Sequence, residues 1–135
     1  MRKALAAALC LVLLAASGTA LAEKTVTLTF VGDCTLGGED WLINREGSFH
    51  DYARKEGYTY FFEKMRDFFS EDDLTIINFE GVLKDDSRDA VNKTYCFRGP
   101  TDFARILPLS SIEAVNLDNN HALDYGKRGK TSTVE

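Results

Sequence analysis

The chain has 135 residues and carries more acidic than basic side chains, which gives it a formal net charge of −5 at pH 7. A chain of this length forms one small domain. An acidic domain as a whole repels phosphate backbones and anionic lipid surfaces, so the composition argues against nucleic acid as a partner.

The N-terminal segment has the three parts of a secretory signal peptide. A basic start at 1–3 precedes an unbroken apolar run at 4–16, and residues 20–22 read Ala-Leu-Ala, a small-residue cleavage site. We therefore predict a signal peptide over 1–22, export from the cytoplasm, and one domain over 23–135. The apolar run is short for a permanent span, so no stable membrane span is expected after cleavage. An uncleaved N-terminal anchor is the alternative.

Two cysteines, Cys34 and Cys96, remain in the predicted mature chain. Export places them where a disulfide can persist. Two cysteines do not make a disulfide framework, however, so we expect two free, partly buried thiols in preference to a bridge.

Three segments are predicted to be strands. Residues 25–31 alternate threonine with apolar side chains, which is the period-two pattern of a strand. Residues 74–79 and 112–117 are short apolar runs of the kind that form buried strands. With a helix between each pair, the order predicts an α/β fold with a mostly parallel sheet and right-handed crossovers.

The segments between the strands contain two predicted helices. Apolar residues recur at helical spacing over 58–69, which predicts an amphipathic helix packed on the sheet. A shorter helix is predicted over 101–107, ending at Pro108. Residues 39–57 are expected to be a long loop with about one helical turn, and 84–93 a charged, solvated loop.

Polar side chains follow each predicted strand. Asp33 comes after the first strand, Asn78 and Glu80 end the second, and Asn-Asn-His at 119–121 follows the third. Because the carboxyl ends of parallel strands share one edge of a sheet, we expect these groups to converge. Carboxylates, amides and an imidazole together suit a divalent cation such as manganese, zinc, iron or magnesium. The plainer alternative is that they only form turns and helix caps.

A site of this kind favours phosphate ester chemistry. A bound cation can lower the pKa of water and hold an oxyanion, and His121 beside it can protonate a leaving oxygen. Asp124 has two interpretations: it caps a helix that begins near Gly126, or it orients His121.

Four motifs follow one another along the chain: FVGDCTLG at 30–37, INFEG at 77–81, FRGP at 97–100 and NNHALDYG at 119–126. In this order they resemble the CapA family of capsule and poly-gamma-glutamate biosynthesis proteins, which is related to the calcineurin-like metallophosphatases. The resemblance spans most of the predicted mature chain. It implies the amino-terminal part of a layered α/β/β/α metallophosphatase-like fold that can hold two metal ions.

The resemblance also implies roles for single residues. Asp33 takes the place of the family's first aspartate, and Asn120 that of its carboxamide ligand. Glu80 or Asn78 takes the metal-bridging place, and His121 that of the acid that protonates the leaving group.

Three further residues have weaker assignments. Arg98 is implied as a contact to an anionic substrate, with a surface arginine in a loop as the alternative. Asn119 and Asp124 are expected to support the site from behind the residues that act in it, Asp124 by orienting His121.

The chain departs from the family's pattern in two ways. Asp118 and the pair Ser110-Ser111 stand where the family has small apolar residues and a small-Gly step. The family also continues beyond this length, so the resemblance implies an amino-terminal half. We expect that half, alone, to be marginally stable or association-prone, because a parallel sheet needs both faces covered. Weak metal binding and little or no hydrolysis are expected with it.

Two functions from different classes follow from the resemblance. The first is an exported cell-envelope enzyme that hydrolyses a phosphoester with a bound metal. The second is a non-catalytic accessory protein that binds an anionic polymer or partner proteins during capsule or poly-gamma-glutamate assembly.

Overall fold

The computed structural model describes residues 23–135, so the predicted signal peptide over 1–22 lies outside the described part of the chain. None of the helices in this described range is long and apolar enough to cross a membrane. The prediction of export rests on the leader sequence alone.

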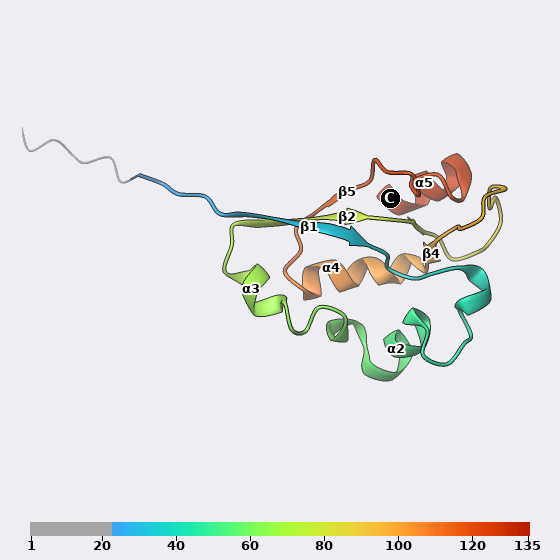
Figure 1. The fold of residues 1–135 in the computed structure, drawn as a ribbon, viewed down its shortest axis with the longest axis horizontal. Helices are drawn as coiled ribbons and strands as arrows, with labels where there is room; N and C mark the ends of the chain where they lie inside the picture. The colour runs from blue at the N-terminus through green and yellow to red at the C-terminus, as the bar shows by residue number, and fades with distance from the viewer. Residues whose placement is uncertain (1–22) are drawn as a thin grey trace, which may run out of the picture.

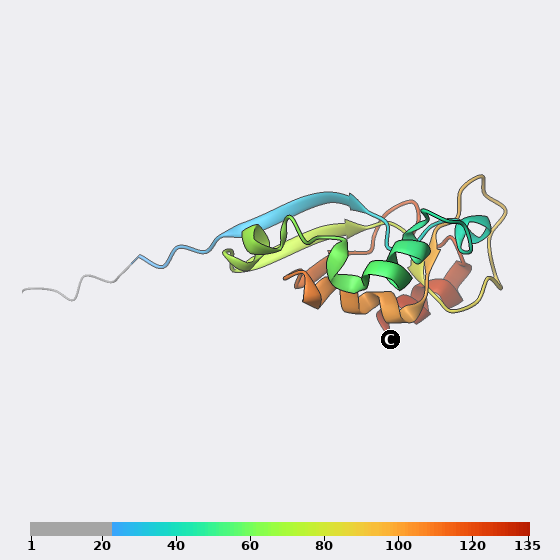
Figure 2. The same ribbon diagram turned by 90° about the horizontal axis from the view of Figure 1, so that it is seen from below.

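A three-stranded parallel sheet runs through the middle of the structure (Figure 1). Its strands are β1 (Leu28–Cys34), β2 (Leu74–Phe79) and β5 (Ala114–Asn116). Figure 2 shows β1 as an outer edge strand, with β2 between it and β5. The predicted α/β class with a mostly parallel sheet is confirmed. Only β2 has the predicted bounds, since β1 begins and ends later and β5 is shorter.

An irregularity in β1 explains why that strand reaches beyond its predicted end. Phe30 pairs with Ile76, and the next recorded pair joins Asp33 to Asn78, so β1 holds one extra residue there. Such a bulge bends a strand and redirects its side chains. Asp33 consequently lies within the sheet, directly opposite Asn78, and not in a turn after the strand.

One face of the sheet is covered by helices. The helices are α2 (Phe49–Glu56), α3 (Arg66–Ser70) and α4 (Ile106–Leu109), and they lie on the same side of the strands (Figure 1). Their buried side chains form the core with Ile77 and Phe79 of β2. Burial of this apolar surface supplies most of the favourable free energy of folding.

The other face of the sheet is open over the described residues. Successive side chains of a strand point to opposite faces, and those of β2 alternate between buried and half-buried. On β1, Leu28 is 50% exposed and Phe30 72% exposed. The apolar side of the first strand therefore faces away from the helices.

The predicted loop over 39–57 is wrong in its second half, which contains α2. A short 3-10 helix, η1 (Asp40–Leu42), comes first. The side-chain oxygen of Ser48 then accepts a hydrogen bond from the backbone N–H of Asp51 at 3.1 Å, which satisfies a free donor at the start of α2. This capping pattern was present in the sequence.

The single predicted helix over 58–69 is also wrong. The segment forms a 3-10 helix, η2 (Tyr58–Tyr60), then a turn, and then α3. Phe61 stacks on Phe49 of α2 with ring centroids 3.8 Å apart, whereas Phe62 lies against Phe69 at 6.3 Å. Because neighbouring aromatic side chains pack on different elements, the chain turns between them. Regular spacing alone could not reveal that division.

The helical segment after Pro100 begins as η3 (Thr101–Arg105) and continues directly into α4. The predicted last helical residue, Leu107, is therefore wrong by two residues, since α4 continues through Pro108 to Leu109. Pro108 lies within the single turn of α4.

A second, smaller sheet was not predicted. Strands β3 (Val82–Leu83) and β4 (Arg98–Gly99) pair in parallel. Helix α5 (Gly126–Val134) packs on β3, where Gly129 allows close approach: a side-chain carbon there would meet a Val82 methyl at 3.3 Å. This sheet holds both ends of the 84–97 segment beside the carboxyl ends of β1 and β2.

The two cysteines are free thiols, as predicted. Burial raises the pKa of Cys34, with a further contribution from the Asp33 carboxylate. Burial also raises the pKa of Cys96. Both are therefore protonated, weakly nucleophilic thiols at neutral pH.

Candidate functional site

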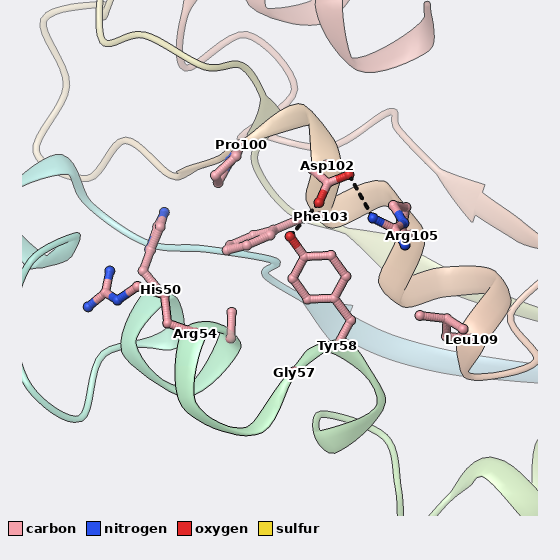
Figure 3. A pocket seen from close by; sticks show the side chains of 10 residues that line it. His50, Arg54, Gly57, Tyr58, Pro100, Asp102, Phe103, Arg105 and Leu109 are labelled. Atoms are coloured by element: carbon pink, nitrogen blue, oxygen red, sulfur yellow. Dashed lines mark hydrogen bonds and ion pairs between the residues drawn. The ribbon is translucent and has the colours of Figure 1, made fainter.

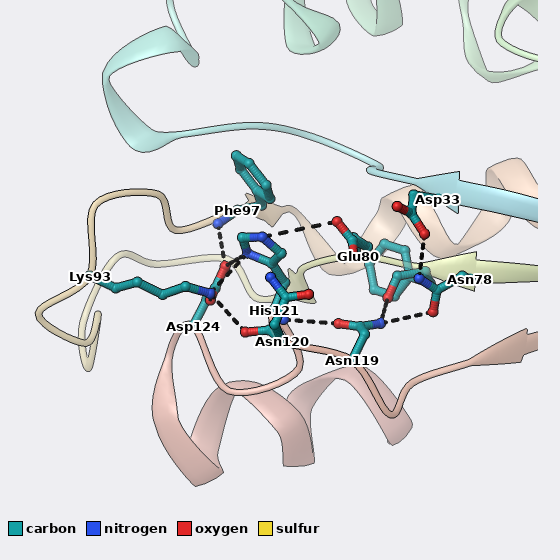
Figure 4. A network of polar contacts seen from close by, with 10 residues as sticks. Asp33, Asn78, Glu80, Lys93, Phe97, Asn119, Asn120, His121 and Asp124 are labelled. Carbon is teal, nitrogen blue, oxygen red and sulfur yellow. Dashed lines mark hydrogen bonds and ion pairs between the residues drawn. The ribbon is translucent and has the colours of Figure 1, made fainter.

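A chain of side-chain hydrogen bonds crosses the carboxyl ends of all three strands (Figure 4). Asn78 donates its amide N–H to Asp33 Oδ1 at 2.7 Å. Asn116, which pairs with Asn78 across the sheet, donates to Asn78 Oδ1 at 2.7 Å. The sheet register thus places one polar residue from each strand on the open face.

Asn119 joins this polar chain to the turn after β5. Its amide nitrogen donates to Asn78 Oδ1 at 3.1 Å and to the carbonyl oxygen of Phe79 at 2.8 Å. Its side-chain oxygen accepts the backbone N–H of His121 at 3.0 Å. Asn119 therefore ties the backbone of His121 to the middle strand.

His121 and Asp124 form a buried pair. His121 Nδ1 lies 2.6 Å from Asp124 Oδ2, and their side chains are 9% and 1% exposed. Since an ionised carboxylate only accepts hydrogen bonds, Nδ1 carries the proton. Nε2 then faces Glu80, whose Oε2 lies 4.0 Å away. The His121 ring also stacks on Phe97, with centroids 4.4 Å apart.

The structure decides between the two interpretations of Asp124. Tyr125 occupies the N-cap position of α5, and no side chain caps that helix. The carboxylate of Asp124 bonds instead to His121 and accepts the backbone N–H of Phe97 at 2.8 Å. The helix-cap interpretation is wrong because this carboxylate points away from the start of α5.

Glu80 lies between the polar chain that crosses the strand ends and the His121–Asp124 pair. Its backbone N–H donates to the carbonyl oxygen of Cys34 at 3.0 Å, which holds it beside the end of β1. Figure 4 shows the Glu80 side chain between Asp33 on one side and His121 on the other, with Asn120 in the same region. The residues that the sequence placed at three strand ends therefore meet at one edge of the sheet.

This geometry can be compared with known proteins. Residues 27–135 match the family model of the bacterial capsule synthesis protein PGA_cap. The chain belongs to this capsule synthesis family. The resemblance to CapA is thereby confirmed, and membership indicates a role at the cell envelope. No curated protein matches the sequence.

The side chains of this capsule synthesis protein fit a divalent cation only in part. Among residues 23–135, no three His, Cys, Asp or Glu side chains lie close enough to hold one by themselves. Asp33 and Glu80 would therefore need an amide oxygen as a third donor. Asn120, which lies in the same region, is the candidate for that place, and its role as a ligand stays a prediction.

Asn78 does not fit as a ligand in this arrangement. Asn119 is fixed at both ends by backbone groups, so its N–H must point at Asn78 Oδ1. That oxygen also accepts from Asn116, and the Asn78 nitrogen faces Asp33. Asn78 therefore orients the Asp33 carboxylate and offers no oxygen beside it.

Arg98 is buried, with 7% of the residue exposed, so the interpretation as a surface arginine is wrong. Its Nε and Nη2 atoms donate to Asp40 Oδ1 at 2.9 and 2.6 Å, and Nη1 donates to the carbonyl oxygen of Lys84 at 2.8 Å. These bonds join β4 to η1 and to the segment after β3. A substrate contact by Arg98 stays a prediction.

Sequence reasoning missed two residues at the site. Lys93 was assigned to a solvated loop, yet its ammonium group reaches Asp124 Oδ1 at 2.8 Å. Asn116 was treated only as part of a strand. Asn116 could have been found from the sequence, because it is an asparagine near the end of the third strand, as Asn78 is near the end of the second. No local pattern marks Lys93.

A separate pocket of about 580 Å³ lies between α2 and the η3–α4 segment (Figure 3). Arg54 and His50 stand on one side of it, and Tyr58 and Arg105 on the other. The arginine side chains are 56% and 67% exposed, although each pairs with a neighbouring aspartate at 3.3 Å. Burial, followed by nearby Arg98 and Arg54, lowers the pKa of His50, which is therefore neutral at pH 7.

Proposed function

We propose that this capsule synthesis family member is exported to the cell envelope and, in its full-length form, hydrolyses a phosphate ester with a bound divalent cation. The observation that carries the proposal is the buried His121–Asp124 pair, whose Nε2 faces Glu80 at the same sheet edge as Asp33. An imidazole with one nitrogen fixed by a carboxylate is a suitable proton donor or acceptor at the other.

Oxygen donors of this chain would hold the cation. They are the carboxylates of Asp33 and Glu80 and the side-chain oxygen of Asn120, and the metal is manganese, zinc, iron or magnesium. Once bound, the cation supplies Lewis-acid chemistry, because it polarises a phosphoryl oxygen and makes water more acidic. Asn78 keeps Asp33 oriented through the 2.7 Å hydrogen bond.

His121 moves the proton in this proposal. Water attacks phosphorus, a new phosphorus–oxygen bond forms, and the bond to the leaving oxygen breaks. His121 enters this step with protons on both ring nitrogens and gives the Nε2 proton to the leaving oxygen, and a proton released by the attacking water then returns to Nε2. Asp124 stabilises the cationic imidazole during this transfer, as it accepts from Nδ1 at 2.6 Å.

The test is hydrolysis of an aryl phosphate by the full-length protein with added manganese. We expect kcat/KM to fall at least about a hundredfold in His121→Asn, in the range typical of lost acid–base groups. A similar loss is expected in Asp33→Asn, which removes a charged oxygen donor from the cation. Asp67→Asn, at an exposed position of α3, is the matched control and should keep the wild-type rate. A wild-type protein without activity, or variants with unchanged rates, would contradict the proposal.

A second candidate is a non-catalytic accessory protein that binds an anionic polymer. It is favoured by the pocket of about 580 Å³ between α2 and the η3–α4 segment, whose lining includes the partly exposed side chains of Arg54 and Arg105. Polyglutamate is a suitable probe, because its carboxylates match the arginines. Saturable binding that is lost in Arg54→Met and Arg105→Met, with no phosphatase activity, would favour this function over the first.

A further inference from the structure

Lys93 lies in the segment between β3 and β4 and reaches three atoms of the site. Its Nζ atom is 2.8 Å from Asp124 Oδ1, 2.7 Å from the carbonyl oxygen of Asn120 and 3.2 Å from His121 Nδ1. The Lys93 side chain is 33% exposed, whereas that of Asp124 is 1% exposed. The ammonium group thus sits at the boundary between solvent and a buried carboxylate.

Counting donors and acceptors identifies what each contact does. An ammonium group and a protonated Nδ1 are both donors, so the 3.2 Å approach between Lys93 and His121 is not a hydrogen bond. Lys93 instead donates to Asp124 Oδ1. The other oxygen, Oδ2, is left for His121 and for the backbone N–H of Phe97.

The same segment contacts this turn at further points. The backbone N–H of Val91 donates to the carbonyl oxygen of Asp124 at 2.9 Å. Phe97 supplies both a backbone N–H to Asp124 and the ring that stacks on His121. The segment therefore covers the His121–Asp124 pair, and Lys93 is its only cation on that carboxylate among the described residues.

We propose that Lys93 is a positioning residue for His121. It balances the charge of the buried Asp124 carboxylate and, by bonding Oδ1, directs Oδ2 toward Nδ1 of His121. Nε2 is thereby kept pointing at the Glu80 side of the site. The catalytic meaning of this arrangement rests on the proposed function, but the arrangement itself can be tested without it.

Nuclear magnetic resonance of the imidazole groups is the direct test. The chain has two histidines, and a His50→Gln variant assigns their signals. In the wild type we expect a protected Nδ1–H proton for His121. Lys93→Met should speed its exchange with solvent at least about tenfold, because the hydrogen-bonded carboxylate is no longer held. Lys93→Arg should restore protection, and Lys127→Met, at an exposed position of α5, should not change it.

Further variants keep the proposal falsifiable if Lys93→Met folds poorly. The double variant Lys93→Met/Asp124→Asn should give the same His121 signal as Asp124→Asn alone, since Lys93 acts through that carboxylate. An additional change in the double variant, or an unchanged His121 signal in Lys93→Met, would overturn the proposal.

Activity separates this proposal from the proposed function. If the full-length protein hydrolyses aryl phosphate, Lys93→Met should lower kcat about tenfold with little change in KM, as expected for a misplaced proton donor. If the wild type is inactive but the Nδ1–H signal responds as predicted, the positioning role stands and the hydrolytic function fails.

Discussion

Asn119 donates a hydrogen bond from its side-chain amide to the side-chain oxygen of Asn78 at 3.1 Å. Through this bond the turn that carries the candidate proton donor is joined to the strand that orients the candidate ligand Asp33. The remaining bonds of Asn119, to the backbone of Phe79 and His121, fix which end of its amide faces Asn78. One amide therefore sets the orientation of the whole polar chain.

Replacement of Asn119 by alanine should destabilise the protein. The change leaves the Phe79 carbonyl and the His121 N–H without their partner, which we expect to cost about 2 kcal/mol in the free energy of unfolding. Urea denaturation measures this, with exposed Asn44→Ala as the control. Equal stability of the two variants would show that the turn is held by other contacts.

Arg98 should affect stability more than substrate binding. Arg98→Met removes two charged hydrogen bonds to Asp40 and one to the Lys84 carbonyl, so we expect a loss of about 3 kcal/mol. Arg98→Lys keeps the charge but not the planar fork, so it should recover only part of the loss. Unchanged stability together with a raised KM would instead support the implied substrate contact.

The two faces of the sheet should respond differently to truncation of an apolar side chain. Ile77 is 1% exposed, and Ile77→Ala should cost about 3 kcal/mol of unfolding free energy through loss of burial and a cavity. Phe30 is 72% exposed, and Phe30→Ala should change stability by less than about 0.5 kcal/mol. Thermal or urea denaturation compares them. A large loss in Phe30→Ala would mean that this face is covered.

Tyr125 should give stability a dependence on alkaline pH. Burial, followed by the nearby Asp40 carboxylate, raises the pKa of Tyr125 to about 12, whereas an unfolded tyrosine titrates near about 10. The folded state holds this proton more tightly. The protonated Tyr125 side chain therefore contributes its full share to the free energy of unfolding below a pH of about 10. That share is lost as the pH rises toward about 12.

An absorbance titration tests this prediction. Of the five tyrosines, Tyr125 and Tyr58 should ionise later than the others, Tyr58 because its hydrogen bond to the Asp102 carboxylate raises its pKa. Tyr125→Phe should remove one of these late steps and leave the other. The same variant should show a shallower fall in unfolding free energy over this pH range. Exposed Tyr95→Phe is the control. Simultaneous ionisation of all five tyrosines in the folded protein would contradict the assignment.

Sequence patterns predicted the parts of the fold that depend on local order. Residues 74–79 are a short apolar run whose bounds equal those of β2, because a central strand is buried on one face and paired on both edges. The extra residue in β1 left no such mark, since a bulge depends on pairing with another strand. The helix expected over 58–69 failed because Phe61 and Phe62 pack on different elements.

The candidate site was predictable to the extent that its residues follow strands. Asp33, Glu80 and Asn120 reach one edge of the sheet because parallel strands end together. The orientation of the Asn78 amide could not be predicted, since it depends on bonds from Asn116 and Asn119. Lys93 was not predictable either, because it arrives from a segment whose path is fixed by the small sheet of β3 and β4.

The central claim is that Asp33 and Glu80 share one divalent cation close to His121. Titration of the full-length protein with manganese, followed by electron paramagnetic resonance, tests it most directly. We predict one saturable site whose Kd rises at least about tenfold in both Asp33→Asn and Glu80→Gln, because each loses a charged oxygen donor. Absence of saturable binding, or a Kd that neither substitution changes, would contradict the claim.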